Sequence, residues 1–290
     1  MLEQFWQDLS GPGSLLLLTV LAVVLAAVAC GVMGSYVVAR RCSYMVGAVS
    51  HSLLGGIGLA LLCQRRLGIG WFTPLWGALL AAVLAAVLIS VFSWRGQRRE
   101  DTLLSAVWAL GMALGLSCIF AIPGYPVDLN SYLFGNILLV TPQDLKIMAG
   151  LDAIILVLVW LFHARFLCLC FHEEGLRLRG VNADLFLLLL NLLLALTVVM
   201  LAQVAGVILC LALMILPSAT AAICCRRLPA IMLLGGIFCL LGSLAGLMLS
   251  YAFNLPTGAT IVEVSGGIYL LMALGAACRR KFCRSGAGNS

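Results

Sequence analysis

The chain has 290 residues, of which 63% are hydrophobic and only 10% are charged, and its mean hydropathy is +1.16. A soluble domain of this size could not bury that much apolar surface, so the composition excludes a soluble protein and predicts one surrounded by lipid. The formal net charge of +6 does not indicate a nucleic-acid partner, because the basic residues lie in short clusters between apolar runs.

Apolar runs follow one another along the whole chain. A helix needs about 20 apolar residues to cross a bilayer core about 30 Å thick, so each run is a candidate span. We count about nine, with eight or ten left open: 14–39, 44–63, 72–94, 102–122, 130–162, 184–202, 205–225, 231–252 and 258–278. The predicted fold class is therefore all-α, a polytopic membrane protein with a single transmembrane domain over residues 1–290.

Two of these runs have features of interrupted helices. The second run is rich in glycine, and the fifth is long enough to hold a short half-helix before its main span. Either run could therefore be broken or re-entrant.

The polar parts of the chain are short. Residues 1–13 carry Glu3 and Asp8 but no basic residue, so they lack the positive region of a cleavable signal peptide, and we expect the first span to remain. The longest polar interval, roughly 163–182, is too short to fold alone. Neither Lys146 nor Lys281 follows a glycine as a P-loop lysine does, so we expect the energy source on another chain.

The basic residues predict the orientation, because cytoplasmic loops carry an excess of Lys and Arg. A cytoplasmic C-terminus, with the basic tail 279–290, leaves only Arg65, Arg66 and Lys146 outside, together with the segment 1–13. Arg65 and Arg66 fit this topology only if the second run does not fully cross. The fourteen other basic residues are then cytoplasmic: Arg40, Arg41, Arg95, Arg98, Arg99, Arg165, Arg177, Arg179, Arg226, Arg227, Arg279, Arg280, Lys281 and Arg284.

Ionisable residues inside spans are the first functional candidates, because each costs about 3 kcal/mol or more there. His51 is one, since neutral imidazole is a good ligand for zinc, manganese or iron; the alternative is a core histidine bonded to a neighbouring helix. Asp152 and Glu263 are the others, and for both the alternative is an interhelical hydrogen bond or a retained proton. Asn191 and Gln203 are expected to pack helices.

Four separated stretches carry a family resemblance. In chain order they are GSYVV, RCSYM and SHSLLG within 34–55, DLNSYLFGNIL and TPQDL within 128–145, GVIL and LMILPSATA within 206–221, and NLPTGATIV at 254–262. Together they resemble the permeases of the metal-type ABC import family, which carries zinc, manganese or iron.

The resemblance implies a permease with eight or nine helices that moves a divalent transition metal, with a slight preference for zinc, into the cytoplasm. It implies a second permease subunit, the same or related, two cytoplasmic ATPase subunits that use ATP, and an extracytoplasmic metal-binding protein. The chain itself binds no cofactor in this scheme. Its place is the cell membrane, the inner one where there are two.

The resemblance also indicates site residues. The metal pathway candidates are His51, Glu263, Ser50 and Asp128, with His51 and Glu263 as metal ligands. The family usually carries an Asp four residues before the histidine, on the same helix face, whereas this chain has Gly47 there. The cytoplasmic segment 163–183, which could otherwise lie on the membrane surface, matches the ATPase-docking region, with His172 where an Asp is common. The docking candidates are His172, Glu173, Glu174, Leu176 and Gly180.

Three other functions are alternatives to this one. A vitamin or siderophore permease of the related ABC class would have a wide pathway, and an ion-coupled secondary transporter would use Glu263 and Asp152 as proton carriers. An intramembrane enzyme would need Ser50 and His51 to face each other, but adjacent helical residues diverge by about 100°. We therefore predict that the chain is not an enzyme.

Overall fold

The computed structural model describes residues 15–94, 100–122, 135, 137 and 140–286. Within these ranges nine helices are long and apolar enough to cross a membrane, and there is no strand. This confirms the all-α, polytopic fold class. The long helices are α2 (Leu15–Arg40), α3 (Ser43–Leu67), α4 (Pro74–Trp94), α5 (Glu100–Phe120), α7 (Pro142–Phe171), α9 (Ala183–Ala205), α10 (Val207–Cys224), α11 (Leu228–Phe253) and α12 (Thr257–Gly286).

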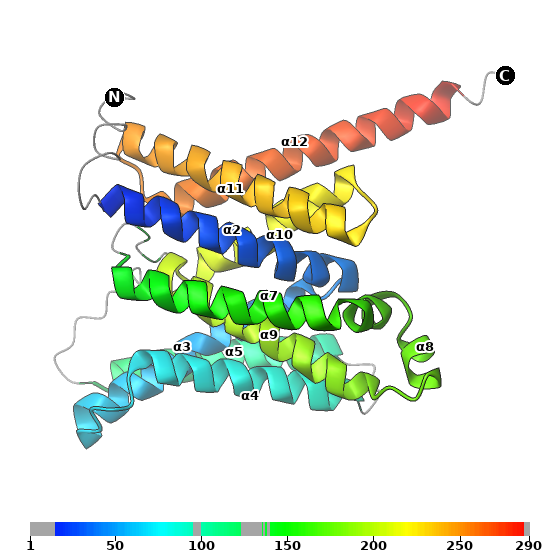
Figure 1. Ribbon diagram of the computed structural model, residues 1–290. Helices are drawn as coiled ribbons and strands as arrows, with labels where there is room; N and C mark the ends of the chain where they lie inside the picture. Colours follow the sequence, from blue (N-terminus) through cyan, green and yellow to red (C-terminus); the bar gives the residue numbers. More distant parts are fainter. Residues whose placement is uncertain (1–14, 95–99, 123–134, 136, 138–139, 287–290) are drawn as a thin grey trace.

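The nine helices form one bundle with their axes roughly along a common direction (Figure 1). Helix α9 is the most buried of them, whereas α5 and α12 are the least buried. In the view of Figure 1, α12 lies along the upper edge and α3, α4 and α5 along the lower edge. The start of α2 and the end of α12 lie on opposite sides of the bundle, as an odd number of crossings requires.

Helix α3 is continuous over 25 residues from Ser43 to Leu67. At 1.5 Å per residue it is about 37 Å long, which exceeds the hydrocarbon core of a bilayer. The expectation that the second run is broken or re-entrant is therefore wrong. Arg65 and Arg66 lie in the last turn of this full-length helix.

Helix α7 begins at Pro142 with a complete capping box. The Asp144 amide donates to the Thr141 hydroxyl oxygen at 3.3 Å, and the Thr141 amide donates to the Asp144 carboxylate at 3.0 Å. Such a cap fixes a helix start, so the main span of the fifth run starts here. The half-helix predicted before it falls mostly outside the described residues.

Glycines set the distance between α3 and α5. A methyl group on Gly58 would lie 2.5 Å from the Gly115 carbonyl oxygen, and one on Gly55 would lie 2.9 Å from the Gly111 carbonyl oxygen. The two backbones are therefore in direct contact, as small residues four apart allow in membrane helices. The glycines that suggested a break serve instead to pack one helix on another.

The other side of α3 contacts α4 in the same way. A methyl group on Gly56 would collide with the Gly77 carbonyl group, and one on Gly77 would collide with the Gly56 carbonyl group. Helices α2 and α11 meet similarly, since a methyl on Gly31 would lie 2.7 Å from the Gly236 amide nitrogen.

Polar side chains inside the bundle also join helices. The Asn191 amide of α9 donates a hydrogen bond of 2.9 Å to the Ser90 hydroxyl of α4. Both residues are buried, so this bond confirms the prediction that Asn191 packs helices.

Candidate functional site

His51 lies in the third turn of α3 and is half-buried. Its ring stacks on the indole of Trp108 in α5, with ring centroids 4.5 Å apart and ring planes 14° apart. The Nδ1 atom of His51 is buried and has no hydrogen-bond partner. The structure therefore gives this nitrogen no interhelical hydrogen bond, unlike the alternative considered from sequence.

The glycine contacts explain how the two rings meet. His51 lies four residues before Gly55, and Trp108 lies three residues before Gly111, so each ring is on the same helix face as its glycine. Because Gly55 and Gly111 bring the two backbones together, the rings one turn away are held face to face. The stacking of His51 on Trp108 thus results from the close packing of the α3 and α5 backbones.

Trp108 also covers Gly47, which lies one turn before His51. A methyl group on Gly47 would lie 2.5 Å from Cζ3 of Trp108 and 3.1 Å from both Cε3 and Cη2. The space that any side chain at position 47 would need is therefore occupied by the indole. Sequence analysis missed Trp108, because a tryptophan in an apolar run gives no signal of the helix that it will meet.

The other predicted pathway residues are not gathered around His51 within one chain. Ser50 is fully buried, with a hydroxyl that has no hydrogen-bond partner. Glu263 is exposed on α12, which lies on the other side of the bundle from α3 and α5 (Figure 1). Asp128 lies outside the described residues. In the described part of the chain, no three His, Cys, Asp or Glu side chains are grouped as metal ligands.

Asp152 lies in α7 and is only 4% exposed. Neither of its carboxyl oxygens has a hydrogen-bond partner. Of the two alternatives weighed for this residue, the interhelical hydrogen bond is therefore not formed.

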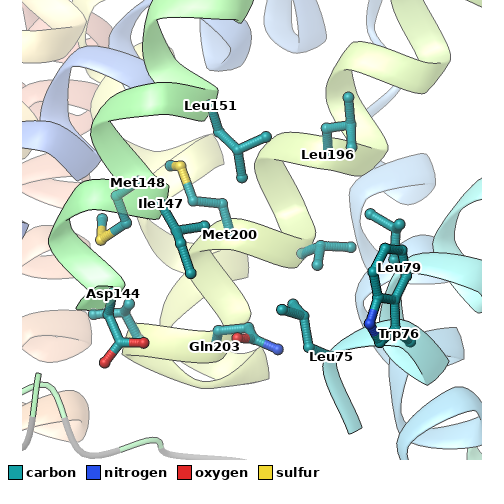
Figure 2. A pocket seen from close by; sticks show the side chains of 12 residues that line it. Leu75, Trp76, Leu79, Asp144, Ile147, Met148, Leu151, Leu196, Met200 and Gln203 are labelled. Carbon is teal, nitrogen blue, oxygen red and sulfur yellow. The ribbon is translucent and has the colours of Figure 1, made fainter. Parts of the chain in front are cut away.

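A cavity of about 170 Å³ lies between α4, α7 and α9. Figure 2 shows that its labelled lining is mostly apolar, with Asp144 and Gln203 at one end. The Asp144 carboxylate already accepts hydrogen bonds from the amide and hydroxyl of Thr141 in the capping box. With its one carboxylate engaged, this cavity offers little to a metal ion.

The segment 163–183, predicted to dock the ATPase, contains a short helix, α8 (Glu173–Leu178). The Leu176 side chain is 3% exposed, so it anchors α8 to the bundle. Arg177 bonds to the Glu173 carboxylate at 3.0 Å and to the Asp184 carboxylate at 2.8 Å. The hydrogen bond to Glu173 raises the pKa of Arg177, so its positive charge is retained. These contacts fix α8 against the start of α9.

The outer surface of this segment is open. His172, Glu174 and Gly180 are exposed, and Glu173 is half-buried. Gly180 has a φ of +72°, a left-handed conformation that favours glycine and turns the chain toward α9. A groove beside α8 runs between the ends of α7 and α11, and its lining residues include Phe171, His172, Arg179 and Arg226.

Comparisons with known proteins agree with this architecture. The model of the ABC 3 transport family matches residues 14–276. A probable metal transport system membrane protein of Chlamydia trachomatis is 38% identical, over 90% of this chain and 88% of that protein. The manganese transport system membrane protein MntC of Halalkalibacterium halodurans is 31% identical, over 86% of this chain and 83% of that protein.

A solved structure shares the fold of this chain and part of its sequence. It is that of PsaBC from Streptococcus pneumoniae in complex with Fab, and it superposes with a TM-score of 0.81 at 29% identity, covering 94% of this chain and 95% of that one. The resemblance found in the sequence is thereby confirmed. The chain belongs to the ABC 3 transport family and is a multi-pass membrane permease of a metal-type ABC importer.

Proposed function

We propose that this permease carries a divalent transition-metal ion into the cytoplasm and that His51 contacts the ion on its way. The observation that carries the proposal is the unpartnered Nδ1 of His51, buried inside a span and held by the Trp108 ring. A polar nitrogen without a partner costs free energy in a membrane, so its retention favours a ligand role. Imidazole is a ligand for zinc, manganese and iron alike.

The relatives bear on which ion is carried. The relative from Halalkalibacterium halodurans is named for manganese, and none of the relatives described above is named for zinc. We therefore test manganese first, ahead of the zinc that the sequence slightly preferred. Iron is tested as well, because the same types of ligand bind it.

We place α8 and the C-terminus in the cytoplasm. This choice puts fourteen of the seventeen basic residues inside, including Arg177, whose contacts fix α8. That majority outweighs Arg65 and Arg66, which the full-length α3 leaves outside. The exposed residues His172, Glu174 and Gly180 and the half-buried Glu173 then form the surface that meets the ATPase, and Leu176 holds that surface in position. The groove beside α8 adds positive charge from Arg179 and Arg226.

The remaining ligands are proposed to come from beyond the described part of one chain. A second permease subunit, identical or related, can bring its own histidine or carboxylates to the same pathway. Asp128, Ser50 and Glu263 stay candidates, of which Glu263 is exposed on α12 and so accessible to a neighbouring subunit. The extracytoplasmic binding protein would deliver the ion at the other end.

The proposal is tested by metal uptake in a host that lacks its own importers and expresses the permease with its ATPase and binding protein. We expect manganese, iron or zinc to accumulate with the wild type and to fail with His51→Ala at equal membrane level, as measured by mass spectrometry. His163→Ala is the matched control, since His163 lies in the long helix α7 and is hydrogen-bonded to Tyr36 at 2.8 Å.

Three results would speak against the proposal. Uptake that His51→Ala leaves unchanged would make His51 a packing residue and would favour the wide pathway of a vitamin or siderophore permease. Uptake that persists without the ATPase would favour the ion-coupled secondary transporter. The absence of any metal accumulation would contradict the metal cargo itself.

A further inference from the structure

Trp108 contacts two neighbouring positions of α3 at once. Its ring lies flat against His51, and the same ring occupies the space above Gly47, 2.5 Å from where a methyl carbon would be. Residues 47 and 51 are one helical turn apart on one face, so a side chain at position 47 would be the nearest second ligand for an ion at His51. With the indole in this position, such a ligand has no room unless the Trp108 ring shifts.

Trp108 is half-buried and also borders the space beside α5. Its ring lines a groove along α5 whose other walls are apolar, including Leu54, Met112 and Leu116. The groove has no charged residue among its lining residues. None of the described residues that line this groove therefore offers a carboxylate oxygen in place of the one that Gly47 lacks.

Ligand type decides which ion such a site prefers. Carboxylate oxygens suit manganese, whereas imidazole suits zinc and iron, and each ligand that is lost or gained shifts the balance between them. Groups that orient a metal ligand without touching the metal typically change affinity or activity by about 10- to 100-fold. A ring stacked on a histidine ligand is such a group.

We propose that Trp108 is a positioning and selectivity residue: it holds the His51 ring and excludes an acidic side chain at position 47, which favours zinc and iron over manganese. This rests on the proposed function, in which His51 contacts the transported ion. This preference of the wild-type permease for zinc and iron is defined by comparison with a variant that carries a carboxylate at position 47.

The steric part of the proposal is tested with Gly47→Asp, Trp108→Ala and the double variant. For each variant, the level of folded permease in the membrane is measured. Gly47→Asp alone should lower that level at least about fivefold, since overpacking costs 1 kcal/mol or more. Gly47→Ala should lower it as well, because a methyl already collides. In the double variant the level should exceed the product of the two single effects, which is the coupling expected of residues in contact. A purely multiplicative result would overturn the steric part.

The selectivity part is tested with uptake from an equimolar mixture of manganese, iron and zinc, normalised to folded permease. Trp108→Ala should lower total uptake about tenfold at limiting metal. Trp108→Phe, which keeps a ring against His51, should retain most of it. Trp160→Ala is the matched control, because Trp160 is 82% exposed on α7. The double variant should raise the manganese-to-zinc uptake ratio about tenfold over that of Trp108→Ala.

The two proposals fail in different ways. If His51→Ala leaves uptake unchanged, the proposed role of His51 fails and this inference fails with it. If His51→Ala abolishes uptake while Trp108→Ala and the double variant keep wild-type uptake and an unchanged ion ratio, only the role of Trp108 is overturned. Loss of uptake in Trp108→Phe equal to that in Trp108→Ala would also overturn ring stacking as the means of positioning.

Discussion

The hydroxyl of Tyr36 in α2 is hydrogen-bonded to Nδ1 of His163 in α7, at 2.8 Å. Tyr36 is 1% exposed, and its ring also meets Phe166 edge-on, with centroids 5.7 Å apart. In His51, by contrast, the Nδ1 atom is buried without a hydrogen-bond partner. The two histidines therefore differ: Nδ1 of His163 has a hydrogen-bond partner in the bundle, whereas Nδ1 of His51 has none.

Replacing Tyr36 by Phe should destabilise the permease by about 1 kcal/mol, because an interhelical hydrogen bond in a membrane contributes about that much. Thermal unfolding of the detergent-purified protein measures the change. Tyr44→Phe is the control, since Tyr44 is 71% exposed and should unfold like the wild type. Uptake per folded permease should not change, and a selective loss of uptake would mean that Tyr36 has a transport role.

Replacing Asp152 by Leu should stabilise the protein. Both carboxyl oxygens are buried without partners, and such a group costs about 1–3 kcal/mol. A leucine of similar shape removes that cost, so the unfolding temperature should rise. Asp144→Leu should have the opposite effect, because it removes the capping box of α7 at a cost of about 1 kcal/mol. A drop in stability with Asp152→Leu would show that the carboxyl has a partner that the described residues do not supply.

Gly58→Ala should lower the unfolding free energy by about 2 kcal/mol, since the added methyl would lie 2.5 Å from the Gly115 carbonyl oxygen and the backbones must separate. Gly267→Ala on α12 is the matched substitution, because nothing lies within 4 Å of the new methyl there. It should leave stability unchanged or raise it by about 0.5–1 kcal/mol. Equal effects of the two variants would contradict the backbone contact between α3 and α5.

The docking segment should separate into anchoring and contacting residues. Leu176→Ala should destabilise the permease by about 2–4 kcal/mol, because its side chain is 3% exposed. Leu178→Ala should leave stability unchanged, since Leu178 is 88% exposed, but should lower the ATPase that copurifies by about fivefold or more. Copurification that is unchanged in Leu178→Ala and in Glu174→Lys would place the ATPase contact elsewhere.

Composition was sufficient to predict the spans, because hydrocarbon thickness fixes how many apolar residues a crossing needs. The predicted run 184–202, for instance, corresponds to α9 at Ala183–Ala205. The end of α7 was less predictable. The predicted run ended at 162, whereas α7 continues to Phe171. In this extension Arg165 lies over the Phe186 ring at 5.0 Å, a contact that lets a charged residue remain in the helix.

The site was predictable only in part, for a related reason. His51 is conspicuous in the sequence because an ionisable residue in a span is rare. Its neighbour Trp108 is not, because hydropathy says where helices are and not which of them pack together. The pairing of α3 with α5 depends on Gly55 meeting Gly111, a contact between residues far apart in the chain. The same contact explains why a glycine-rich run does not break.

The glycine contacts on α3 also limit how this permease can change shape. Backbone from α4 touches it at Gly56, and backbone from α5 touches it at Gly55 and Gly58. Turning or sliding α3 by itself would drive its chain into carbonyl groups on both sides, since close-packed interfaces do not deform continuously. In an alternating-access cycle α3, α4 and α5 would therefore move as one rigid body. The stacked rings of His51 and Trp108 would keep their contact in both the outward-open and the inward-open state.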